Sequence, residues 1–161
     1  MTKESCLEDF KEDYKEIQKK YSLPNFDEMN QDFYIEKAAE TETDYLVREI
    51  RKYVADKISN YVRFIETLLS PSNVPMFVFA VVKNLTENDK KILSETYKKL
   101  AKIEVSLIEL DLEYDEEKEA KFIKNAHKVW NEIRKDLFKI TESINKNWDN
   151  KLEVNGKSYF G

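Results

Sequence analysis

Glycine is nearly absent from this chain of 161 residues. Only two glycines are present, Gly156 and Gly161, and both fall among the last six residues. Tight hairpins and phosphate-binding loops need backbone at positive φ, which glycine adopts at the least cost. Before Gly156 the sequence therefore lacks the glycine-rich fingerprints of nucleotide-binding proteins. It is also poorly suited to a multi-stranded sheet.

Cysteine and histidine are just as scarce, with one residue of each. Cys6 alone excludes an internal disulfide and any site built from several thiolates. His127 has no glutamate three positions before it, so the Glu-x-x-His pairs of di-iron bundles are missing. The opening "MTKESCLEDFKEDYKE" lacks the charged-then-apolar layout of a signal peptide. We expect a cytoplasmic protein and assign no catalytic residue, metal or cofactor.

Charge, in contrast, is abundant. Charged residues make up 37% of the chain, and the net charge is −5. An acidic chain is a poor general binder of nucleic acid, because it cannot neutralise many phosphates. Hydrophobic residues still make up 41%, enough for a core and too many for a disordered acidic tail. The lysine- and glutamate-rich composition suits a thermophile, and an AT-rich genome explains it equally well.

Apolar residues recur every three to four positions over most of the chain, which is typical of amphipathic helices. The pattern predicts helices at about 4–21, 44–69, 75–84, 86–110 and 116–148, with a further short helix within 25–42. In the last of these, apolar residues from Ile123 to Ile144 alternate spacings of three and four, as in antiparallel bundles. We predict an all-α bundle of about five long antiparallel helices, forming a single domain over 1–150.

Several residues are suited to begin these helices. Thr43 or Asp44 is a candidate N-cap, and Thr86 with Asp89 resembles a capping box. The acidic run 109–119 holds seven carboxylates. We expect Asp115 to cap the last helix and the glutamates after it to interact favourably with the helix dipole. Weak binding of a divalent cation is the alternative for this run.

The final residues 151–161 read "KLEVNGKSYFG" and differ from the rest of the chain. Asn155-Gly156 between apolar residues is a strong hairpin signal. We predict a short C-terminal β-hairpin or an extended tail. Its Tyr159 and Phe160 could lie against the bundle, pair with another chain or remain loose.

Residues 67–82, "TLLSPSNVPMFVFAVV", contain no charge at all. The unbroken apolar run Met76–Val82 is far shorter than the roughly 20 residues that span a bilayer, so we predict no membrane segment. A helix that is apolar on nearly every side is usually surrounded by protein. We expect the segment to fill the core between the long helices. The alternative is a surface that binds a partner or a second copy through Met76, Phe77 and Phe79, together with Tyr159 and Phe160 of the tail.

Arginine usage points to one further site. Four arginines stand against 23 lysines, and three of them lie within the predicted helix 44–69. Arginine pairs carboxylates and phosphates in a planar, bidentate manner that lysine cannot match. A trough formed by Arg48, Arg51, Ser59 and Arg63 is therefore a candidate site for an anionic or phosphorylated ligand. The alternative is a buried seam of salt bridges to carboxylates on other helices.

Two short stretches, "DFY" at 32–34 and "LTENDKKIL" at 85–93, are separated by a long predicted helix. This order resembles the helical domain of the archaeal replication GINS subunits. We carry no function and no site over from the resemblance.

Three functional hypotheses follow. The first is a non-enzymatic interaction or scaffold module that self-associates or joins a larger complex. The second is a binding module for an anionic small ligand at the arginine trough. The third is an enzyme of unrecognised type that uses carboxylates and tyrosines, because an acid–base pair on separate helices leaves no spacing signature.

Overall fold

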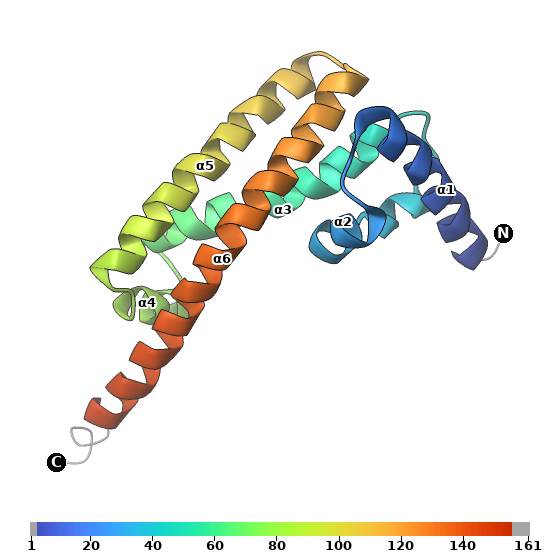
Figure 1. Ribbon diagram of the computed structural model, residues 1–161. Coiled ribbons are helices and arrows are strands. Elements are labelled where there is room, and N and C mark those ends of the chain that lie inside the picture. The colour runs from blue at the N-terminus through green and yellow to red at the C-terminus, as the bar shows by residue number, and fades with distance from the viewer. Residues whose placement is uncertain (1–2, 156–161) are drawn as a thin grey trace. The chain divides into compact units, whose positions relative to one another are not determined.

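The computed structural model describes residues 3–155, and about 85% of these are helical, with no β-strand among them (Figure 1). In chain order the helices of this range are α1 Lys3–Tyr21, α2 Phe26–Phe33, the 3-10 helix η1 Ile35–Glu40, α3 Leu46–Leu69, α4 Met76–Lys83, α5 Glu87–Leu112 and α6 Glu116–Asn155. The predicted all-α class is confirmed. The additional helices arise because the mixed segment 25–42 forms both α2 and η1.

The chain divides into two compact units. The first comprises the residues up to Asn60 together with Ala101–Trp130, and the second comprises Tyr61–Leu100 together with the chain from Asn131 onward. Each unit contains one segment each of α3, α5 and α6, and these segments pack as in a helical bundle. The three residues 113–115 join α5 to α6, so the two helices run antiparallel (Figure 1). The single-domain prediction stays a prediction.

The apolar stripes read from the sequence form the cores of both units. In the first unit the fully buried residues include Ile50 and Ile58 of α3, Ile103 of α5 and Ile123 of α6. In the second unit they are Ile65, Leu93, Leu100 and Ile133. Each of these helices turns one apolar stripe toward its neighbours, which is how an amphipathic helix gains most of its stability in a protein.

The scarcity of glycine has a visible structural consequence. Among residues 3–155, three positions have positive φ without being glycine, namely Ser22 (φ 53°), Tyr34 (φ 56°) and Asn73 (φ 55°). Tyr34 is the C-cap of α2 in the left-handed conformation, where its N–H donates to the carbonyl of Asn30. This position normally favours glycine, because a Cβ adds roughly 1–2 kcal/mol of steric cost there.

The predicted helix starts are partly confirmed. Thr86 and Asp89 form a reciprocal capping box, in which each backbone N–H donates to the side chain of the other residue. Asp115 caps α6 by accepting from the N–H of Lys118. The prediction for α3 was wrong by one or two residues. Thr43 accepts from the N–H of Tyr45 in a local turn, and the helix begins only at Leu46.

The C-terminal prediction falls largely beyond what the structure describes. α6 continues to Asn155, so the residues expected to form the first hairpin arm are helical. The apolar residues Ile144, Trp148 and Leu152 recur every four positions in the sequence, which extends the helical period into this region. Gly156 and the expected second arm with Tyr159 and Phe160 lie outside the described residues.

Shortening one core side chain tests this arrangement. We expect Ile50→Ala to lower the free energy of unfolding by about 2–5 kcal/mol, because Ile50 is fully buried and its removal leaves a cavity. Ile108→Ala is the matched control in the same unit, since Ile108 is largely exposed, and its effect should stay within about 0.5 kcal/mol. Urea unfolding measures both, and equal effects would contradict the assignment of the core.

Candidate functional site

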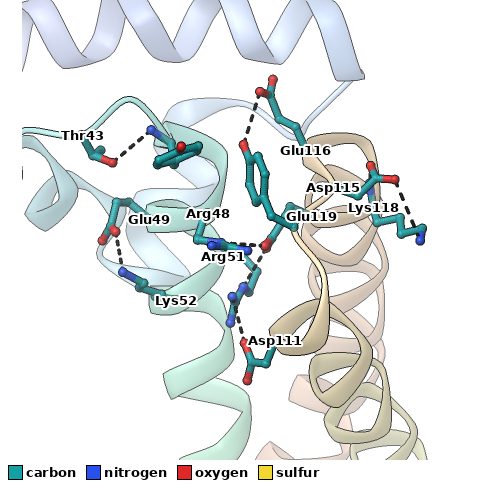
Figure 2. Close-up of polar contacts among 12 residues, drawn as sticks. Thr43, Arg48, Glu49, Arg51, Lys52, Asp111, Asp115, Glu116, Lys118 and Glu119 are labelled. Carbon is teal, nitrogen blue, oxygen red and sulfur yellow. Dashed lines mark hydrogen bonds and ion pairs between the residues drawn. The ribbon is translucent and has the colours of Figure 1, made fainter.

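The most deeply buried charge in the described residues is the carboxylate of Glu119, whose side chain is 0% exposed. It lies in the first turn of α6 and faces two arginines of α3 (Figure 2). The Nε of Arg48 lies 3.1 Å from one carboxylate oxygen, and the Nε of Arg51 lies 2.7 Å from the other. Each oxygen thus accepts a charge-assisted hydrogen bond from a different arginine.

Arg51 also reaches a second carboxylate. Its Nη2 lies 3.2 Å from the Oδ1 of Asp111, in the last turn of α5 (Figure 2). The dipole of α5 disfavours an anion at this end of the helix. The last turn contains no basic residue of its own that could compensate the charge of Asp111. Arg51 supplies the missing positive charge. We call Arg48, Arg51, Asp111 and Glu119 the Glu119 cluster.

These contacts correspond to the salt-bridge alternative for the arginine trough. Arg48 and Arg51 pair with carboxylates of α5 and α6, as just described. Ser59 donates a hydrogen bond to Glu104 of α5. Arg63 belongs to the second unit, where it is exposed. The anionic-ligand hypothesis therefore stays a prediction, without a contact that favours it.

Tyrosines and the carboxylate of Glu116 lie beside the exposed side of the cluster. The guanidinium carbon of Arg48 lies 4.3 Å from the centre of the Tyr114 ring, and Tyr45 packs edge-on against that ring at 5.0 Å. Glu116 accepts hydrogen bonds from the hydroxyl of Tyr21 and from the ammonium of Lys20. These contacts join the end of α1 to the start of α6. Sequence reasoning missed them, because nothing in the spacing pairs residues so far apart.

The pKa shifts in this region move away from neutrality. The hydrogen bond from Tyr21, and then that from Lys20, hold the pKa of Glu116 below its ordinary value. The same bond to Glu116 raises the pKa of Tyr21, and burial raises that of Tyr114. A general acid or base works best with a pKa near the operating pH, so these shifts do not tune the groups for catalysis at neutral pH. The enzyme hypothesis stays a prediction.

The residues considered as metal ligands have other contacts. The Nε2 of His127 lies 4.0 Å from a carboxylate oxygen of Glu28, and its ring packs near Phe33. Among the side chains that the structure describes, no three from His, Cys, Asp and Glu gather in a group that could hold a metal ion. The divalent-cation alternative for residues 109–119 gains no support.

The prediction that residues 67–82 fill the core was wrong for α4. Met76, Phe77 and Phe79 are 84%, 69% and 45% exposed, and only Val81 of this helix is buried. The physical reason is that α4 spans only eight residues and packs one side on its unit. Its other apolar side therefore faces outward. Within residues 3–155, every helix is too short or too polar to cross a lipid bilayer.

Polar and aromatic contacts hold α4 at both ends. The Phe77 ring lies 6.3 Å from that of Trp148 in α6. At the other end Asn84 donates through Nδ2 to the carbonyl of Ala80, and its own carbonyl accepts from Asn147. The exposed side chains therefore project from a helix that is fixed on its unit. We call Met76, Phe77, Phe79 and Ala80 the α4 face.

A second exposed apolar surface lies on α5 in the first unit. Val105, Ile108 and Leu112 are 59%, 62% and 83% exposed. Their spacings of three and four place them on one side of the helix. Sequence reasoning missed this stripe because the buried residues of α5, such as Ile103 and Leu107, dominate its pattern. We call Val105, Ile108 and Leu112 the α5 stripe.

Comparison of this chain with protein-family models, with curated proteins and with solved structures gives no match.

The buried ion pairs can be tested by removing their shared partner. We expect Glu119→Ala to lower the free energy of unfolding by about 3–5 kcal/mol, because the buried Arg51 then keeps the exposed Asp111 as its one ion-pair partner among the described residues. Glu117→Ala in the same helix turn is the control, since Glu117 is exposed, and it should cost under about 1 kcal/mol. Urea unfolding measures the loss in the free energy of unfolding for both variants. Similar losses would show that Glu119 is not a structural anion.

The contacts of Glu116 predict a pH effect. Its pKa is lower in the folded chain than the ordinary 4.5. Its contribution to stability is therefore present above that pH and is lost as the pH falls through the folded pKa. Tyr21→Phe removes the main hydrogen bond and should raise the pKa of Glu116 toward 4.5. An NMR titration of the carboxyl carbon measures the shift, and an unchanged pKa would contradict the assigned cause.

Proposed function

We propose that this chain is a non-enzymatic interaction module that associates with a second copy of itself through the α4 face. The observation that carries the proposal is the exposure of Met76, Phe77 and Phe79 on one short, fixed helix. Soluble proteins seldom expose such contiguous apolar patches unless another surface covers them. A cytoplasmic location, which the single cysteine favours, belongs to the same proposal.

Charge favours a second copy as the occupant. In a two-fold contact the same patch meets itself, so any net charge on the patch would meet its like. The α4 face lies in a segment without charge from Thr67 to Val82, in a chain of net charge −5. Two such chains repel each other through their net charge. The α4 face itself carries no charge, and the cation beside it, Lys83 with its ammonium 4.5 Å from the centre of the Phe79 ring, lies at the C-terminal end of the helix, so an antiparallel pairing of two α4 helices keeps the two lysines apart.

The arrangement of side chains favours the same occupant. At 3.6 residues per turn, the small residue Ala80 falls between the directions of Phe77 and Phe79, while the buried Val81 lies just beyond Phe77, toward the packed side of the helix. A small residue in the middle of a helix face lets a second helix approach closely. The larger side chains can then insert on either side of the crossing, in both copies at once.

Magnitudes indicate a reversible dimer. Covering a whole Phe or Met side chain contributes roughly 1.5–3 kcal/mol, so covering the exposed parts of the three contributes on the order of 3–6 kcal/mol. A two-fold contact covers them in both copies and doubles this to about 6–12 kcal/mol. Association costs roughly 4–15 kcal/mol in lost freedom. The free energy gained by covering one copy of the face is thus near or below the cost of association, whereas the gain from covering both copies can exceed that cost.

Solution mass tests the proposal. In sedimentation equilibrium across the micromolar range, the mass of the purified chain should rise from 19.2 kDa toward twice that value. Met76→Asp should prevent the rise, because it places a carboxylate without a partner inside the apolar contact. The fold should tolerate it, since an acidic residue in the first turn of a helix interacts favourably with the dipole.

Phe138→Asp is the matched control. Phe138 lies in the same unit and is 64% exposed, close to the value for Phe77, yet it lies outside the α4 face. The Phe138→Asp variant should therefore associate as strongly as the unaltered chain. A chain that remains a monomer throughout, or a Met76→Asp variant that associates normally, would reject the proposal.

A further inference from the structure

We infer that the α5 stripe binds a basic amphipathic helix of a partner protein. The inference is independent of self-association, because the stripe lies in the first unit and the α4 face in the second. It rests on three observations, namely the exposure of the stripe, the carboxylates beside it and the contacts that fix α5.

The α5 stripe has the form of a helix-docking surface. Val105, Ile108 and Leu112 occupy positions i, i+3 and i+7 and are each more than half exposed. A partner helix with apolar residues at the same spacing can pack along such a row. Because the row covers two turns of α5, it fits a short amphipathic segment better than a flat surface.

Carboxylates border the C-terminal part of the stripe on both sides, and the exposed Lys102 lies beside its N-terminal end. Glu109 and Glu113 follow Val105 at intervals of four residues, so they lie along one edge. Both are exposed, Glu109 in α5 and Glu113 directly after it. On the other edge lies Asp111, whose side chain is 66% exposed although it also contacts Arg51. An apolar row between acidic edges is complementary to a helix whose apolar side is bordered by lysine or arginine.

This charge pattern distinguishes the α5 stripe from the α4 face. Two copies of the stripe would bring their carboxylates together, which disfavours self-association through this surface. An anionic lipid surface would be repelled for the same reason. A basic partner gains both the apolar contact and the charge contact, so we assign the stripe to a partner helix rather than to a second copy.

The surface is fixed in place before any partner arrives. On the opposite side of α5, Ile103, Leu107 and Leu110 are buried in the unit. Arg51 holds Asp111, and Ser59 holds Glu104, from the neighbouring α3. A surface that is already ordered loses little conformational freedom on binding.

Designed peptides test the inference on the full chain. The first probe is a helical peptide with leucine at positions i, i+3, i+4 and i+7 and lysine beside the leucine row. Two matched peptides serve as comparisons, one with glutamate in place of each lysine and one with the same composition in scrambled order. Fluorescence anisotropy should show binding of the lysine peptide at least about tenfold tighter than that of either comparison.

Charge reversal in the chain is the decisive step. Glu109→Lys with Glu113→Lys should reverse the preference, so that the chain binds the glutamate peptide more tightly than the lysine peptide. The substitutions should leave the fold intact, because lysines near the end of α5 interact favourably with its dipole. Glu8→Lys with Glu12→Lys in α1 is the control, with the same charge change, the same spacing and the same exposure, and it should keep the original preference.

Each remaining outcome overturns the inference. Equal binding of the lysine peptide and its scrambled form would indicate attraction by net charge alone. Binding of neither ordered peptide would mean that the stripe does not accept a helix. An effect of the α1 control as large as that of the α5 variant would place binding elsewhere. None of these outcomes bears on the mass measurement, so the two proposals can fail separately.

Discussion

The structure depends on one constraint, which is that a helix packed on its neighbours can bury only one side. α3, α5 and α6 satisfy this constraint with stripes that meet in each unit, where residues such as Ile58 and Ile133 are fully buried. α4 and α5 carry more apolar side chains than one stripe can hold. The excess faces outward, as the α4 face and the α5 stripe, because no further helix in the described part of the chain covers it. Both proposed interaction surfaces are consequences of this excess.

The Glu119 cluster adds specificity to the apolar packing. Apolar stripes alone tolerate small rotations and shifts of one helix along another, whereas a carboxylate held by two arginines from defined positions of α3 does not. A buried ion pair is weak support for net stability, since its desolvation offsets much of the attraction. Its effect here is to fix the register of α3 against α6 and, through Asp111, against the end of α5. The α5 stripe lies at the same end of α5 that Arg51 contacts through Asp111.

Much of the fold could be predicted from the sequence because helical periodicity is local. The four long helices α1, α3, α5 and α6, the short α4, the capping box at Thr86 and the cap at Asp115 all follow from residues within a few positions of each other. The bond between Tyr21 and Glu116 could not be predicted, since it joins residues 95 positions apart. The arginine spacing indicated that Arg48 and Arg51 act together, but it could not say whether their partners were ligands or carboxylates of the chain itself.

The error over α4 has a different origin. An all-apolar segment satisfies the pattern for a core filler and the pattern for a docking surface equally well, and the difference lies in whether other helices surround it. The sequence of one chain contains no information about surfaces that a second molecule would cover. The exposure of Met76, Phe77 and Phe79 depends on where the neighbouring helices pack, and the same holds for Val105, Ile108 and Leu112.

The most direct measurement of the central claim, that apolar side chains of α4 face outward in the single chain, compares two methionines. Met76 is 84% exposed, whereas Met29 in α2 is fully buried. Treatment of the dilute chain with hydrogen peroxide, followed by peptide mass spectrometry, reports the oxidation rate of each, because oxidation of methionine follows its exposure. We expect Met76 to oxidise at least about tenfold faster than Met29. Equal protection of the two in a dilute monomer would contradict it.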